Sequence, residues 1–250
     1  RTNLSRAYRM PSFYAQYADQ TIKSVTVPGL GLPQTLGNTN LDPEEMTSFE
    51  IGYLGHFFNN KLELDIRLAR ERISNIIDNP KTDNDVYDNN NTIFNVYRFN
   101  FIDYGNVDLD SAEIQLNYKP SNKTFMNFYV GFTETEGFRA NSLDLNKQLY
   151  ETEDLSSHVP YRTTGALISH KPFPDLRLSL QYNYVSAYTS EGDGSNLDSF
   201  ESLDLKFTKE ISTEKGEKLE FSGIVRNVND KPYQDFKNDN LVGLETYFQV

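Results

Sequence analysis

Histidine is the residue type most able to do chemistry at neutral pH, and this sequence has three, His56, His158 and His170. A zinc site needs two or more such ligands at nearby positions. His158 is expected in a long loop, whereas His56 and His170 are expected near short turns, so the three do not converge by sequence. We predict ordinary surface or interface roles for them and no metal site.

Other chemical motifs are incomplete. Asp83, Asp85 and Asp88 resemble part of a calcium loop but lack its Gly and distal Glu, so a solvated loop is favoured. Gly29 and Gly31 are followed by a Gln where a dinucleotide fingerprint needs Gly. The sequence has no GxSxG elbow, Walker loop or HExxH motif. We therefore predict a protein that is not an enzyme and needs no cofactor.

Composition excludes further classes of function. The net charge of -12, from 24 Lys and Arg against 36 Asp and Glu, argues against binding of nucleic acid. The absence of Cys excludes disulfides and thiolate metal sites, and it suits a protein that crosses an oxidising periplasm.

Alternation of apolar and polar residues is the strongest structural signal. In residues 61–67, Leu62, Leu64 and Ile66 alternate with charged residues, so a strand here has one apolar and one charged face. The same pattern recurs in residues 112–118 and 176–184. A soluble sandwich would pack its apolar face on a second sheet, whereas a barrel in a bilayer turns it toward lipid and its polar face toward a wet lumen.

The average hydropathy agrees with such a barrel. The mean hydropathy is -0.62, and no run of residues approaches the length of a membrane helix. Half of every barrel strand faces water, which lowers the average, while the 16 Tyr and 17 Phe suit the two interfacial girdles.

Ten strands are predicted, with no helix that has a convincing apolar stripe. The connections are alternately short and long, as in an antiparallel up-and-down transmembrane barrel. The predicted strands are Thr2 to Arg9, Thr47 to Phe58, Lys61 to Ile76, Phe94 to Lys119, Thr124 to Glu136, Tyr161 to His170, Leu176 to Thr189, Phe200 to Ile211, Lys218 to Arg226 and Leu241 to Val250.

Five segments in this order resemble the C-terminal part of the barrel of a TonB-dependent outer-membrane receptor. NLSRAYRMPSF resembles the family's strand that ends in Arg, a small residue and Pro-Ser, and NTNLDPEEMTSFEIGY resembles its NP.L.PE....E.GY segment. IVRNVNDKPYQDF resembles the near-terminal v.NlfdkrY signature, the most specific of the set. The remaining two are Phe101 to Pro120, with Ser111 and Ala112 where Gly and Val are commoner, and His158 to Phe173.

The resemblance implies a multi-pass barrel of the Gram-negative outer membrane, with about 22 strands and a plugged lumen. Residues 1–250 are expected to be the C-terminal portion of that barrel, without the plug domain, the N-terminal TonB box and the terminal aromatic residue. The implied partners are the TonB energy-coupling complex, the plug of the same full-length protein, lipopolysaccharide, outer-membrane lipid and a small solute.

Candidate site residues follow from these faces and loops. The inward set would line the lumen, where the resemblance implies contact with the plug or passage of substrate: Arg67, Glu71, Glu113, Arg177, Gln181 and Arg226. Aromatic residues of the long loops are candidates for ligand contact: Tyr14, Tyr17, Tyr87, Tyr97 and Phe138. Arg70 and Arg72, on the outward phase, are candidates to bind lipopolysaccharide phosphates or to snorkel to the interface.

The function expected from the resemblance is active uptake of a scarce solute, with a ferric siderophore ahead of vitamin B12, haem or an oligosaccharide. A self-contained barrel acting as a passive pore or surface protease is the alternative. A protease would need acidic residues and a histidine at the rim, for which His158 is the one well placed. A soluble carbohydrate-binding β-sandwich is a third possibility.

Overall fold

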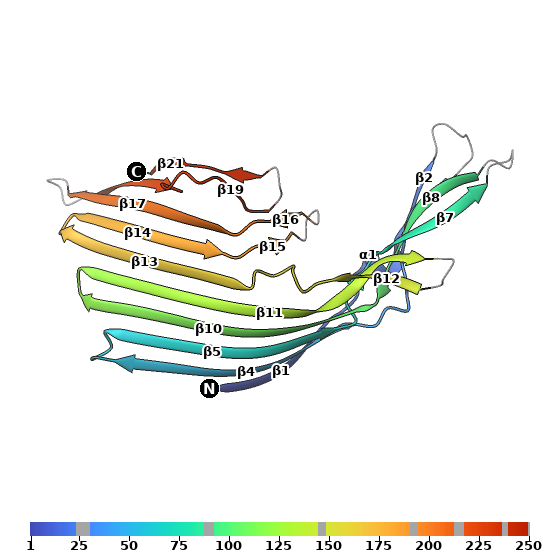
Figure 1. Cartoon of the computed structure of the whole chain (residues 1–250), viewed down its shortest axis with the longest axis horizontal. Helices are drawn as coiled ribbons and strands as arrows, with labels where there is room; N and C mark the ends of the chain where they lie inside the picture. Colours follow the sequence, from blue (N-terminus) through green and yellow to red (C-terminus); the bar gives the residue numbers. More distant parts are fainter. Residues whose placement is uncertain are drawn as a thin grey trace.

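The structure is a computed structural model that describes residues 1–23, 31–87, 93–144, 149–190, 195–212, 218–236 and 240–249. Its main feature is one antiparallel sheet in which ten strands follow each other in chain order (Figure 1). These are β1 (Thr2–Arg9), β4 (Glu44–Phe57), β5 (Leu62–Ser74), β10 (Gly105–Ser121), β11 (Thr124–Asp144), β13 (Arg162–Phe173), β14 (Leu176–Val185), β17 (Phe200–Ser212), β18 (Lys218–Arg226) and β21 (Glu245–Gln249).

The sheet is curved but not closed. Within the described part of the chain, β1 and β21 each pair with one strand of this path, β4 and β18 respectively. They are the two edges of a partial barrel of up-and-down topology. Among the described residues no second sheet packs against it, so the alternative of a β-sandwich is wrong, whereas the expected all-β barrel topology with about ten strands is confirmed.

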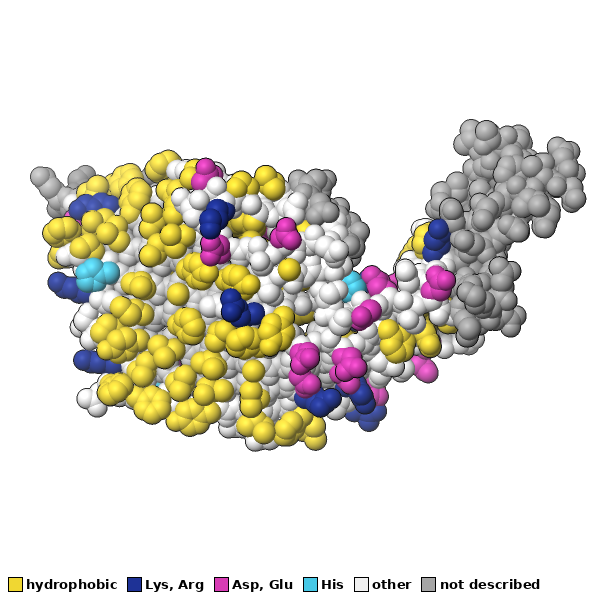
Figure 2. Space-filling view, in the orientation of Figure 1, with side chains coloured by type: hydrophobic (Ala, Val, Ile, Leu, Met, Phe, Trp, Pro, Cys, Tyr) yellow, Lys and Arg dark blue, Asp and Glu magenta, His cyan; other side chains and the backbone are white. Residues whose placement is uncertain are grey.

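The two faces of the sheet differ in polarity because side chains alternate along every strand. Leu68 on β5 lies opposite Ile51 on β4 and Ala112 on β10, and all three belong to the convex, outward face. Leu68 is 52% exposed, and Leu178 on β14 is 47% exposed. Figure 2 shows that apolar side chains cover much of this face. An apolar surface of this extent needs an apolar partner outside the chain.

The turns at one end of the sheet are short. Phe58, Asn59 and Asn60 link β4 to β5 with φ values of 52°, 55° and 62°, a conformation that asparagine tolerates better than most residues. Asn122 and Lys123 join β10 to β11. The predicted turn between β17 and β18 falls mostly on residues outside the described ranges. Short turns fix the register between neighbouring strands, and so fix which side chains meet on each face.

The other end carries longer connections with structure of their own, and part of it projects beyond the barrel wall (Figure 1). The elements there are α1 (Phe13–Tyr17), β2 (Asp19–Lys23), β3 (Gly31–Leu36), β7 (Lys81–Tyr87), β8 (Ile93–Asn100) and β12 (Leu149–Asp154). Short pairs add β6 (Ile77–Asp78) with β9 (Ile102–Asp103), β15 (Tyr188–Thr189) with β16 (Asn196–Leu197), and β19 (Tyr233–Gln234) with β20 (Leu241–Val242).

Strand prediction succeeded along the barrel wall and failed at its rim. The bounds of β1 and β18 agree with the prediction at both ends. The predicted strand from Phe94 to Lys119 is wrong, because β8 leaves the wall to pair with β7 and β3, and the wall strand β10 begins at Gly105. The predicted last strand divides into β20 and β21 around Gly243 and Leu244.

One short helix was not predicted. Ser12 caps α1 by accepting a hydrogen bond from the backbone N–H of Ala15 at 3.0 Å, which satisfies a donor at the helix start. Five residues are too few for an apolar stripe to show in the sequence. Within the described residues, no helix has the length and apolar character needed to cross a lipid bilayer.

Gly165 tests the packing of the inward face. A Cβ at this position would lie 2.0 Å from the ring of Tyr129, which covers the glycine from the neighbouring strand β11. Gly165→Ala should therefore displace the ring and cost about 1 kcal/mol of barrel stability. Gly131→Ala is the control, because its Cβ would meet nothing nearer than the Thr163 hydroxyl at 3.1 Å. Thermal unfolding of the full-length protein, followed by gel mobility, is the measurement. If the folded band of both variants disappears at the same temperature, the proposed packing of Tyr129 over Gly165 is wrong.

Candidate functional site

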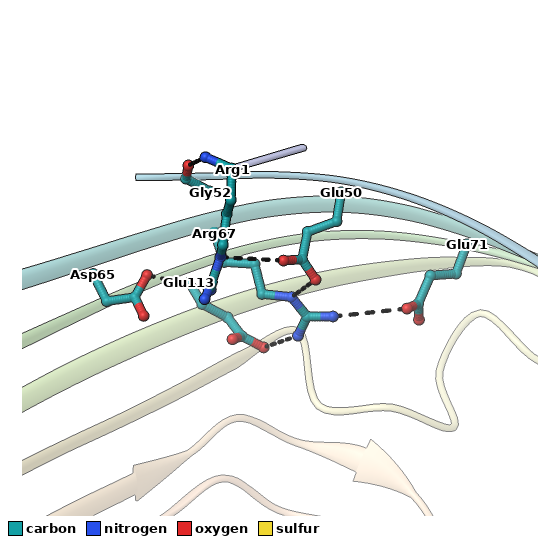
Figure 3. A network of polar contacts seen from close by, with 7 residues as sticks. All are labelled: Arg1, Glu50, Gly52, Asp65, Arg67, Glu71 and Glu113. Atoms are coloured by element: carbon teal, nitrogen blue, oxygen red, sulfur yellow. Dashed lines mark hydrogen bonds and ion pairs between the residues drawn. The ribbon is translucent and has the colours of Figure 1, made fainter. Parts of the chain in front are cut away.

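The guanidinium of Arg67 on β5 lies at the centre of a polar network on the inward face (Figure 3). Its Nε donates to the Glu50 carboxylate of β4 at 2.8 Å, and its two other nitrogens lie 3.5 Å from Glu113 of β10 and 3.8 Å from Glu71. The side chain of Arg67 is one third exposed. Three carboxylates from three adjacent strands thus share one cation.

Strand register explains why these groups meet. Gly52 lies directly opposite Arg67 on β4, so no side chain occupies the nearest cross-strand position. Arg1 uses the same opening, with its Nε 3.5 Å from Glu50 and its Nη2 3.5 Å from Asp65 (Figure 3). Glu50 is therefore shared between two arginines, and the network extends from Arg1, which precedes β1, across β4, β5 and β10.

The network carries an excess of negative charge. It joins two arginines to four carboxylates, those of Glu50, Asp65, Glu71 and Glu113. A partly exposed acidic surface of this kind attracts cationic groups, and its effect weakens with salt. The hydroxyl of Ser48 on β4 donates to Glu71 at 3.3 Å and adds a neutral hydrogen bond to the network.

The other predicted lumen residues face inward but lie apart from this network. Arg177 on β14 donates to the Ser169 hydroxyl at 3.3 Å, and Gln181 donates to Asn183 at 3.1 Å. Arg226 on β18 lies 3.6 Å from Glu245 of β21. The structure therefore brings together Arg67, Glu71 and Glu113, and it leaves the other three on the β14 to β18 side of the wall.

Arg70 and Arg72 point to the outward face, as predicted from their phase on β5. The Nε and Nη2 atoms of Arg72 each donate to the Asp108 carboxylate of β10 at 2.7 Å, and Arg70 lies 3.7 Å from Asp110. Their contact with lipopolysaccharide stays a prediction. The register of β5 and β10 places an aspartate opposite each of them, a pairing that was not predicted from the sequence.

Among the predicted loop aromatics, those whose side chains the structure describes lie on α1 and β11. Tyr14 and Tyr17 belong to α1, where Tyr14 packs edge-on against Phe101 at 5.7 Å and Tyr17 lies 4.9 Å from Phe13. Phe138 lies near the rim on β11, with Tyr104 5.6 Å away. The Tyr87 and Tyr97 side chains lie outside the described residues. Contact of these aromatics with a ligand stays a prediction.

Each of the three histidines contacts a different partner. His56 lies 3.7 Å from Glu63, His170 is hydrogen-bonded to Thr124 at 2.9 Å, and the largely buried His158 lies 3.4 Å from Glu153. In the part of the chain that the structure describes, no group of three or more His, Cys, Asp or Glu side chains is arranged to hold a metal ion.

A second polar cluster lies at the long-loop end. Arg139 donates to Glu153 at 2.8 Å and lies 3.5 Å from Asp78, which ties β11 to β12 and β6. Next to Glu153, the backbone N–H and hydroxyl of Ser156 hold the pKa of Asp154 below its usual range. Asp154 is therefore ionised under ordinary conditions and adds to the negative charge of this rim.

Arg1, Glu50 and Asp65 are the network residues that sequence reasoning missed. Alternation in residues 47–53 places Glu50 on the polar face, so that part of the signal was present. Its contact with Arg67 depends on the pairing of β4 with β5, which the four residues from Phe58 to Lys61 determine. The sequence signal that could have predicted this contact is the length of the turn between two strongly alternating strands.

The comparisons with known proteins agree with this architecture. The family model described as "TonB dependent receptor-like, beta-barrel" matches residues 1–228. The open sheet of ten strands with a polar inner face is part of the wall of a β-barrel. The chain belongs to the TonB-dependent receptor family. No curated protein sequence matches the chain.

Solved structures of similar fold are receptors and transporters. The siderophore receptor PirA from Acinetobacter baumannii has a TM-score of 0.65 at 14% identity and covers 99% of this chain. A mutant of the ferric enterobactin receptor PfeA from Pseudomonas aeruginosa, in complex with enterobactin, has a TM-score of 0.65 at 15% identity and covers 97%. The copper transporter OprC has a TM-score of 0.62 at 10% identity and covers 99%. The chain spans 37%, 34% and 35% of these three proteins, about a third of each.

The Arg67 network predicts a stability effect. Arg67→Gln leaves Glu50, Glu71 and Glu113 without their shared cation, so repulsion between carboxylates should destabilise the barrel by about 1 kcal/mol at low salt. Arg177→Gln removes an inward arginine whose hydrogen-bond partner is a serine, and it serves as the control. Thermal unfolding of the full-length protein at two salt concentrations is the measurement. We expect the Arg67→Gln deficit to shrink at high salt, and a deficit independent of salt would exclude the electrostatic explanation.

Proposed function

We propose that the chain is the C-terminal portion of the barrel domain of a TonB-dependent transporter in the Gram-negative outer membrane, and that the full-length protein takes up a ferric siderophore. The observation that carries this proposal is the wall itself. Ten antiparallel strands present an exposed apolar face on one side and a charged network on the other. A bilayer outside and an aqueous lumen inside satisfy both faces.

The proposed partners follow from the same wall. The two unpaired edges, at β1 and β21, need further strands of the same polypeptide to close the barrel, because exposed strand edges are not tolerated in lipid. The acidic Arg67 network is proposed to contact the plug domain or to line the path of the solute. TonB supplies the energy, and transport follows from a difference in affinity between plug states.

A siderophore is the favoured cargo because PirA and PfeA, both similar in fold, are described as siderophore and ferric enterobactin receptors. OprC, of comparable similarity, is described as a copper transporter, so a copper-bearing solute is the second candidate. No covalent step at the barrel is proposed, because the function requires binding and passage rather than a reaction.

Uptake in whole cells tests the proposal. Cells that depend on the full-length protein should accumulate radioactive iron from a ferric catecholate siderophore, and deletion of TonB should reduce accumulation to background. Copper uptake measured in parallel distinguishes the two candidate cargoes. Iron accumulation that persists without TonB would instead support a passive pore, the alternative expected from a self-contained barrel.

Leu178 tests the placement of the wall in lipid. Leu178→Arg places a cation on the apolar face, where it costs roughly 2 to 4 kcal/mol near the bilayer midplane, so assembly into the outer membrane should fall sharply. Gln181→Arg adds the same side chain on the inward face of the same strand β14 and should assemble normally. Membrane fractionation of cells expressing the full-length variants is the measurement. Normal assembly of Leu178→Arg would contradict this orientation of β14.

A further inference from the structure

The outward face has a trough that runs along β10. Its floor consists of small or short side chains, Ala112, Asp110, Asp108 and Asn106, which alternate along the strand toward the long-loop end. Side chains of β5 and β11 form the two walls. At about 3.4 Å per residue, the trough from Ala112 to Asn106 is about 20 Å long.

Two adjoining cavities mark this trough. The first, of about 390 Å³, is lined on its apolar side by Ile51, Leu68 and Phe132 and ends at Arg70 and Glu134. The second, of about 750 Å³, lies farther toward the long loops, and its lining includes Arg72, Asp108, Glu136, Phe138 and Asp154. The trough therefore changes from apolar to charged along its length, as an amphiphilic ligand does.

The charged part consists of two parallel rows across three strands. Asp110 lies between Arg70 and Glu134, and two residues further along, Asp108 lies between Arg72 and Glu136. Each row thus carries one positive and two negative charges. The two arginine side chains are 68% and 69% exposed, so each has donors facing outward beyond its aspartate.

Glu134 and Glu136 differ from the aspartates. Both are exposed, and within the described residues neither forms an ion pair with a Lys or Arg side chain. A simple phosphate placed on a row would satisfy the arginine but add to the excess negative charge beside the glutamate. A ligand that carries both a phosphate and an ammonium group matches the arginine and the glutamate of one row.

An aromatic group closes the trough at the long-loop end. Tyr104 lies 5.6 Å from Phe138 and 5.3 Å from Tyr150, and both tyrosines remain partly exposed. Figure 2 shows the order on this face, with the apolar belt followed by acidic and basic side chains toward the projecting end. Rings with one apolar face and one polar tip suit the headgroup layer of a membrane.

We propose that the β10 trough binds an outer-leaflet lipopolysaccharide whose lipid A phosphate carries an amine substituent. An acyl chain lies against Leu68, Ala112 and Phe132, the phosphate accepts hydrogen bonds from Arg70 and Arg72, and the ammonium donates to Glu134 or Glu136. The inference rests on the proposed function in one respect, that this face meets the membrane. It adds a specific lipid to that account.

Native mass spectrometry of the delipidated full-length protein in detergent tests this inference, with lipid A as the probe and EDTA present. Lipid A bearing phosphoethanolamine should bind about tenfold more tightly than unmodified lipid A, the gain expected from one charge-assisted contact. The double variant Glu134→Gln and Glu136→Gln should lose this preference. The double variant Arg70→Gln and Arg72→Gln should bind both lipids about tenfold more weakly and keep the preference.

Arg6→Gln is the matched control. Arg6 on β1 pairs with Glu45 through two hydrogen bonds of 2.6 Å on the same outward face, but it lies outside the trough, so binding should not change. Equal binding of the two lipids to the unmodified protein would overturn the inference, as would a preference that survives loss of both glutamates. Binding of unmodified lipid A that appears when Mg²⁺ replaces EDTA, without an amine preference, would also overturn it. Iron uptake by cells and membrane assembly of the Leu178→Arg variant test the proposed function independently of lipid binding.

Discussion

The structure depends on one constraint, the two-residue alternation of side chains in a sheet one layer thick. A wall without a second layer cannot bury its apolar face in its own core, and seven hydrophobic residues are buried in the described part of the chain, most of them at the rim or on loops. The two faces must therefore meet two different environments. The pairing register between strands fixes both faces together, because a slip of one residue would turn Arg67 and its carboxylates to the apolar side and Leu68 to the polar side.

The same constraint explains why the inward and outward charges behave differently. On the inward face, Gly52 opposite Arg67 leaves room for a diagonal contact with Glu50, so several carboxylates gather around one guanidinium. On the outward face, Arg72 finds Asp108 directly across and forms a two-pronged pair. Clustered charge suits a solvated lumen that meets a partner, whereas paired charge is less costly beside a lipid headgroup.

Much of the wall could be predicted from the sequence because alternation is a local signal. The bounds of β1 and β18 and the phase of Arg67, Glu71 and Glu113 all follow from it. The connections at the rim could not be predicted in the same way. β8 and β10 read as one continuous strand, and their separation depends on pairing of β8 with β3 and β7, which are distant in sequence. The partners of Arg67 and Arg72 likewise depend on register between strands, which becomes visible once turn lengths are known.

The most direct measurement of the central claim is a cysteine scan along β5 of the full-length protein in the outer membrane. This part of the chain has no native Cys, so single substitutions from position 62 to position 69 can be labelled individually. We expect a water-soluble maleimide to label the odd positions, which include Arg67, and a lipid-soluble reagent to label the even positions, which include Leu68. Equal labelling of both sets by the water-soluble reagent would contradict a lipid-facing wall.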